Sequence, residues 1–130
     1  MLSEGLLRAK MEEALAGAPN PDWEKKTAGK TEFLLKVMAP RQGKAEAPEA
    51  IQPQSKLSRV EVMAKLAETR AKTLKFAEST EATMNDHTSE HPFAIFNTLS
   101  AYQWLLYIPL HNMRHDKQIQ EVMGTEGYPK

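Results

Sequence analysis

Two histidines four residues apart, His111 and His115, have the spacing in this sequence that most directly suggests chemistry. Side chains four residues apart on a helix lie about 5–6 Å from each other on one face. Two imidazoles so placed can bind one divalent ion, because zinc–nitrogen bonds are about 2.0–2.1 Å long. The pair therefore predicts half of a metal site. Asn112 stands where the protease motif H-E-x-x-H needs its glutamate, so a zinc protease is excluded.

A third histidine ligand is not evident from the sequence alone. His87 and His91 precede the last predicted helix, and about 20 Å of helical rise separates the start of that helix from His111. We therefore expect His91 to be a loop or capping residue and His87 to be solvated. The alternative to a metal site is that His111 and His115 are hydrogen-bonded residues of a helical core, since buried polar groups need partners.

Apolar spacing predicts three long helices and a short one, and the histidine pair lies in the last of them. The predicted helices span residues 2–16, 31–38, 58–79 and 98–123. The first has an apolar stripe of Leu7, Met11 and Ala14 that Leu6 and Leu15 widen. The third has one apolar face, made of Val62, Leu66, Ala67, Leu74 and Ala77. Ser58 and Glu61 have the spacing of a capping box at the start of the third. One stripe of the last helix runs through both histidines; it consists of Trp104, Ile108, His111, His115, Ile119 and Val122. This stripe predicts that both imidazoles face the core.

Three connections join these helices, over residues 18–30, 39–56 and 80–97. The middle one is rich in Ala, Pro and Gln and is longer than a routine connection. We interpret it as a crossover over the surface and not as a domain boundary, because neither side can bury a core alone. No strand is predicted. The sequence thus indicates one all-α domain over residues 1–130.

Composition excludes several classes of protein. Lys plus Arg and Asp plus Glu both number 17, so the chain lacks the positive excess that nucleic-acid binding needs. No block of like charge favours a membrane surface. The chain has no cysteine, which excludes disulfides, thiolate metal ligands and a cysteine nucleophile. It also shows neither a signal-peptide pattern nor an apolar run long enough to span a bilayer, so we expect a cytoplasmic protein.

Taken in order, these features resemble the DinB-like superfamily of metal-binding four-helix bundles. The resemblance is carried by "HPF" followed by "LSAYQWLLYIPLHNMRHDKQIQEV", by "KLSRVEVMAKLAETRAKTLKF", and by the crossover "KAEAPEAIQP". It implies four helices with a long connection between the second and the third. It also implies a zinc or nickel ion held by three histidines, two of which match His111 and His115.

The sequence departs from that family pattern at its start. The family's remaining histidine opens a pattern like H-[LIV]-x-x-x-E on the second helix. Here "MLSEGLL" matches the end of this pattern, with Glu4 at the acidic position, so the histidine would fall just before Met1. The resemblance therefore implies an incomplete, N-terminally shortened bundle of three main helices, a short helix and a long crossover. Metal binding is then expected to be weak or lost. A water or a carboxylate could fill the third position and give weaker binding, and Glu4 is a poor candidate for it.

The resemblance implies a divalent-metal-binding protein related to thiol-dependent S-transferases or metal-dependent hydrolases, acting on a small molecule that the sequence does not specify. It leaves open whether the chain is an enzyme. Gln118 is expected near the face of the helix that carries the two histidines. A missing helix would leave an apolar groove, so we expect the chain to dimerise through it or to fold its N-terminal segment into it. The alternative function is a non-catalytic structural or dimerisation module with a vestigial metal site.

Overall fold

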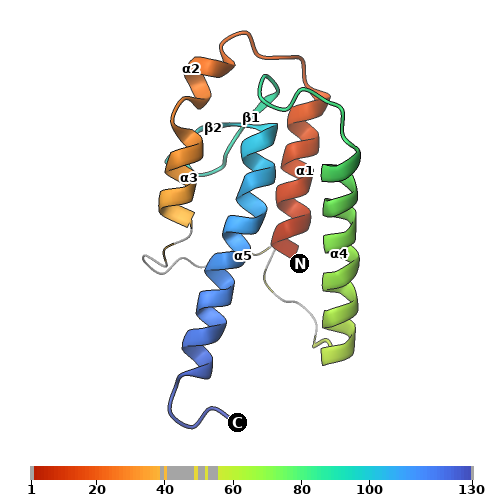
Figure 1. The fold of residues 1–130 in the computed structure, drawn as a ribbon, viewed down its shortest axis with the longest axis vertical. Coiled ribbons are helices and arrows are strands. Elements are labelled where there is room, and N and C mark those ends of the chain that lie inside the picture. The colour runs from red at the N-terminus through yellow and green to blue at the C-terminus, as the bar shows by residue number, and fades with distance from the viewer. Residues whose placement is uncertain (1, 39, 41–48, 50–51, 53–55, 130) are drawn as a thin grey trace.

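The computed structural model describes residues 2–38, 40, 49, 52 and 56–129. Three long helices lie along roughly the same direction, with a short helix beside them and a small hairpin near one end (Figure 1). The elements are α1 (Leu2–Ala16), α2 (Trp23–Thr27), α3 (Lys30–Met38), α4 (Arg59–Ser79), β1 (Thr88–Glu90), β2 (Thr98–Ser100) and α5 (Ala101–Met123). This arrangement confirms the predicted all-α class. Most of the predicted crossover over 39–56 lies outside the described residues.

The starts of the two longest helices are set by serine side chains. Ser58 accepts a hydrogen bond from the Glu61 amide, and the Glu61 carboxylate accepts one from the Ser58 amide, as the capping box predicts. Ser100 and Gln103 form a second such box. The last helix therefore begins at Ala101 and not at Thr98.

Three short elements were not predicted, two strands and one helix. The residues from Thr98 to Ser100 form β2, which pairs antiparallel with β1 so that Thr88 faces Ser100. Strands of three residues are too short for apolar alternation to show in the sequence. The five-residue helix α2 is likewise too short to display a helical period. The prediction of no strand and of an irregular loop over 18–30 was wrong for these segments.

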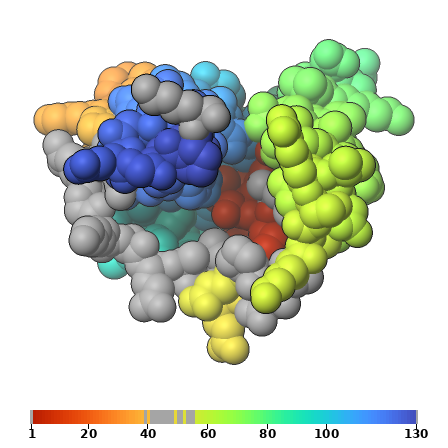
Figure 2. Space-filling view, turned by 90° about the horizontal axis from the view of Figure 1, so that it is seen from below, coloured from red at the N-terminus to blue at the C-terminus, as the bar shows by residue number. Residues whose placement is uncertain are grey.

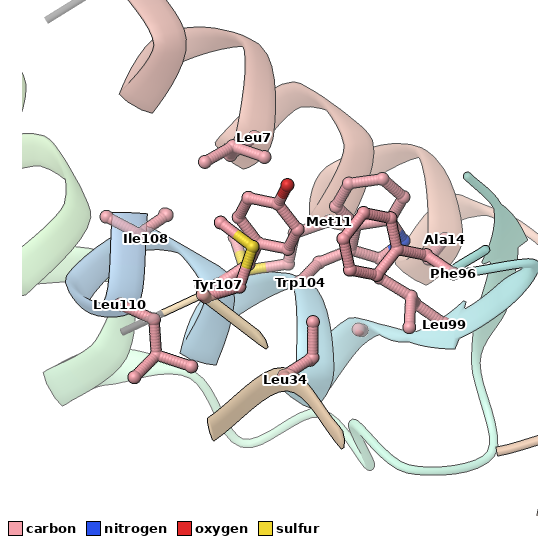
Figure 3. Close-up of a cluster of buried hydrophobic side chains, with 12 residues drawn as sticks. Leu7, Met11, Ala14, Leu34, Phe96, Leu99, Trp104, Tyr107, Ile108 and Leu110 are labelled. Atoms are coloured by element: carbon pink, nitrogen blue, oxygen red, sulfur yellow. The ribbon is translucent and has the colours of Figure 1, made fainter. Parts of the chain in front are cut away.

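The core is formed where α1, α3 and α5 meet. Figure 3 shows apolar side chains from these elements and from the segment before α5 pointing toward one another. Its buried members are Leu7, Met11, Ala14, Leu34, Met38, Phe96, Leu99, Ala101, Trp104, Tyr107, Ile108 and Leu110. The predicted stripe of α1 is confirmed by Leu7, Met11 and Ala14. Leu6, which was expected to widen it, is 46% exposed.

Helix α4 contributes little to this core, against which its partly buried Phe76 packs. Its predicted apolar face of Val62, Leu66, Ala67, Leu74 and Ala77 lies toward solvent, and its buried residue is Thr73. Instead, Met63, Leu66, Ala67 and Arg70 line a groove. The molecular surface is hollowed between α4 and α5, with α1 at the bottom (Figure 2). The prediction for α4 was wrong because periodicity identifies an apolar face but not whether another element covers it.

Helix α5 continues beyond the core. Its C-terminal half projects past α1 and α3 (Figure 1), and Ile119 and Val122 are 57% and 56% exposed. The predicted stripe is therefore buried at Trp104 and Ile108 but not at its far end. None of the described helices is long and apolar enough to cross a membrane.

Candidate metal centre

The two histidines lie at the point where α5 leaves the core. Their ring centroids are 4.4 Å apart and the ring planes meet at 78°. His111 is half-buried and His115 is exposed. The expectation that both imidazoles face the core is thus only partly met at His111 and is wrong at His115, because α1 and α3 do not extend to that turn. The spacing nevertheless brings the two rings together.

Burial keeps the His111 imidazole neutral. It lowers the pKa of His111 from 6.5 to about 4, and the positive charges of His115 and Arg114 act in the same direction. A neutral imidazole has a lone pair on one ring nitrogen, which is the form that binds a metal. His111 is therefore ready to act as a ligand near neutral pH.

Gln118 orients the second ring. Nδ1 of His115 lies 2.7 Å from Oε1 of Gln118, one helical turn further along α5. When Nδ1 donates to this amide oxygen, the lone pair of the ring lies on Nε2, which is then available for an ion. Metal-binding histidines commonly donate their other ring nitrogen to such an acceptor. Gln118 was expected near the face of the histidines, and it contacts His115.

His91 lies in an aromatic cluster within the core. Its ring stacks on Trp104, with centroids 4.9 Å apart and planes at 12°, and its Nδ1 accepts a hydrogen bond from the Phe93 amide. Burial lowers the pKa of His91 to about 4. Tyr107 separates it from the pair of His111 and His115, because the Tyr107 ring centroid lies 5.6 Å from that of His91 and 6.1 Å from that of His111. His91 is a loop residue, as expected, but its burial was not foreseen.

His87 has a different partner from the one expected. Its Nδ1 lies 3.0 Å from the carbonyl oxygen of Gly17, at the end of α1. The ring therefore ties the connection after α4 to α1 and is not simply solvated.

The Glu4 carboxylate is engaged elsewhere. It is almost fully buried and forms a bidentate pair with Arg70, with N–O distances of 3.0 and 3.1 Å. Burial acts to raise the pKa of Glu4, but hydrogen bonds from Arg70 and Thr73 and the Arg70 charge outweigh it, so the pKa is lowered. Among the described residues, no three His, Cys, Asp or Glu side chains gather as a ligand set.

The residues present fit a divalent ion in part. Two adjacent imidazoles, one neutral through burial and one held by an amide, are the nitrogen donors that zinc and nickel accept. Two protein ligands leave further coordination positions open to water or to a small molecule. The arrangement therefore supports binding of an exchangeable ion better than a closed structural site.

The chain matches the family model of the DinB superfamily over residues 6–119, which include most of α1 and the pair of His111 and His115. Neither the curated proteins nor the solved structures contain a match to the chain.

Proposed function

The chain belongs to the DinB superfamily, and from this premise we propose that it binds a divalent ion through His111 and His115. The observation that carries the proposal is the pair of imidazoles with centroids 4.4 Å apart on one face of α5. The neutral state of His111 and the contact from Gln118 to His115 support it, because both favour the ligand form of an imidazole.

The proposed activity is metal-assisted reaction of a small molecule with a thiol or with water. A bound zinc or nickel ion lowers the pKa of a bound thiol or water and holds it toward a substrate. In this chain, His111 and His115 would hold the ion, and Gln118 would fix the ring of His115. The exposed side of His115 leaves room for a small molecule to approach.

A metal titration tests this proposal. We expect zinc or nickel to raise the free energy of unfolding by about 2.7 kcal/mol when the free metal is about one hundred times the Kd. His111→Ala and His115→Ala should abolish the rise, which thermal unfolding followed by circular dichroism would measure. His87→Ala is the matched control, because this histidine contacts Gly17 and should leave the metal effect unchanged. An unchanged melting temperature for the wild-type chain in excess metal would refute the proposal.

The exposed face of α4 favours a second candidate function, a non-catalytic dimerisation module. Val62, Met63 and Leu66 are 39%, 57% and 36% exposed, and two of them line the groove beside α1. A second copy packed into this groove would remove apolar surface from water at about 25 cal/mol per Å². Sedimentation velocity without metal should then show a dimer that Leu66→Lys dissociates. A wild-type monomer that binds no dye for exposed apolar surface would contradict this candidate.

A further inference from the structure

Tyr107 lies on the face of α5 that carries both histidines. It precedes His111 by four residues, as His111 precedes His115, so the three side chains follow one another along the helix. The ring centroids of Tyr107 and His111 are 6.1 Å apart, and the ring planes meet at 31°. An ion bound to His111 would lie about 2.0–2.1 Å from a nitrogen of that ring. A small molecule held at the ion would therefore come close to Tyr107.

The Tyr107 ring is held in one position by the core. The residue is 7% exposed. Its ring centroid lies 5.6 Å from those of His91 and Phe96 and 6.2 Å from that of Trp104. Side chains in such close-packed surroundings stay in one rotamer on average. The core therefore fixes where the hydroxyl of Tyr107 lies.

The Tyr107 hydroxyl lacks a partner within the protein. Among the described residues, no group forms a hydrogen bond with it. It is also not one of the polar side-chain atoms of that part of the chain that are shut off from solvent without a partner. In Figure 3 the hydroxyl oxygen points toward α1, on the side where Leu7 lies. A buried tyrosine usually donates its proton to an acceptor, so this hydroxyl is available to a bound molecule.

We propose that the Tyr107 hydroxyl donates a hydrogen bond to a thiol held at His111 and His115. The inference rests on the proposed metal-binding function, since it concerns the same site. A divalent ion there favours the anionic form of the thiol. A phenol keeps its proton at neutral pH and so acts as the donor, and a hydrogen bond to an anion is about twice as strong as one between neutral groups. Tyr107 thus binds and orients the thiol without being a ligand of the ion.

Tyr107→Phe tests the inference, because it removes the hydroxyl and keeps the ring. Isothermal titration calorimetry would measure the binding of nickel, and then the binding of 2-mercaptoethanol to the nickel-loaded chain. We expect the variant to bind nickel as the wild type does and to bind the thiol about tenfold more weakly. Tyr102→Phe is the matched control, since Tyr102 lies on the same helix and is 44% exposed, and it should change neither dissociation constant.

The outcomes separate this inference from the proposed function. Equal thiol affinities for the wild type and Tyr107→Phe, or a nickel-loaded wild type that binds no thiol, would overturn the inference and leave metal binding by the histidines standing. A wild-type chain that binds no nickel would overturn the proposed function itself. Thermal unfolding without metal tests for a structural role of the hydroxyl. We expect equal melting temperatures for Tyr107→Phe and the wild type, and a marked decrease in the variant would count against the inference.

Discussion

Helix α1 packs against α5 and against α4 in opposite ways. Toward α5 it presents Leu7, Met11 and Ala14, which are all buried in the core. Toward α4 it uses polar contacts, the ion pair of Glu4 with Arg70 and a hydrogen bond from Arg8 to a backbone carbonyl. The first contact gains from apolar burial, whereas polar contacts gain little net free energy over the water they replace. Helices α4 and α5 both pack against α1, but apolar burial holds α5 and polar contacts hold α4. The two helices are therefore not equally stable parts of one core.

The largest expected effect comes from removing a core side chain. Leu99 is fully buried, so Leu99→Ala should lower the free energy of unfolding by about 2–5 kcal/mol. Leu66→Ala removes the same atoms from α4, where the side chain is 36% exposed, and should cost about 1 kcal/mol or less. Urea unfolding of both variants measures the difference. Equal losses would mean that α4 is as fully packed in solution as the core around Leu99.

Acid should weaken the aromatic part of the core. The pKa of His91 is about 4 in the folded chain and 6.5 ordinarily, so the unfolded chain binds the proton more readily between these values. The free energy of unfolding should therefore fall as the pH drops from about 6.5 toward 4, by at most about 3 kcal/mol from His91. The depressed pKa of His111 adds to the loss in the same range. Urea unfolding at several pH values measures the slope.

A variant at His91 sharpens this pH test. His91→Phe keeps an aromatic ring against Trp104 but cannot take up a proton. The variant should lose less stability than the wild type over the same range, whatever its stability at neutral pH. Identical pH slopes for the two proteins would show that His91 is not buried as a neutral ring.

The smallest expected effect concerns the polar contact of α4. Glu4→Gln removes the charge that pairs with Arg70 and should lower the free energy of unfolding by about 1–2 kcal/mol. The loss is limited because the Arg70 side chain is 41% exposed and can turn toward water. Glu12→Gln is the control, since its pair with Arg8 is on the surface and should be worth about 0.5 kcal/mol or less. Indistinguishable variants would mean that the Glu4 pair does not secure α4.

Local signals in the sequence predicted helix ends and one packed face. The capping box at Ser58 and Glu61 placed the start of α4 correctly, because it depends on residues three apart. The stripe through Leu7 and Met11 identified the buried side of α1. The face of α4 was predicted wrongly, since amphipathic spacing contains no information on whether a neighbouring element reaches that face.

The candidate site was predicted in part. The spacing alone predicted that His111 and His115 lie together. It could not show that α5 extends past α1 and α3 before it reaches His115, which is therefore exposed. The burial of Glu4 had a signal, because it lies three residues before Leu7 on the same side of α1. Its partner Arg70 is 66 residues away in sequence, and no local pattern connects the two. His91 is buried because the loop between β1 and β2 brings its ring against Trp104 of α5, and no local pattern predicts this contact either.

The division of α5 into a packed half and a projecting half separates folding from binding within one helix. The last three turns contain no buried residue, so the cost in stability of substitutions there should be small. New ligands, charges or contacts can therefore arise there without the usual conflict between activity and stability. The single turn from His111 to His115 spans the boundary, so one imidazole of the proposed metal centre lies against the core and the other lies on the projecting half.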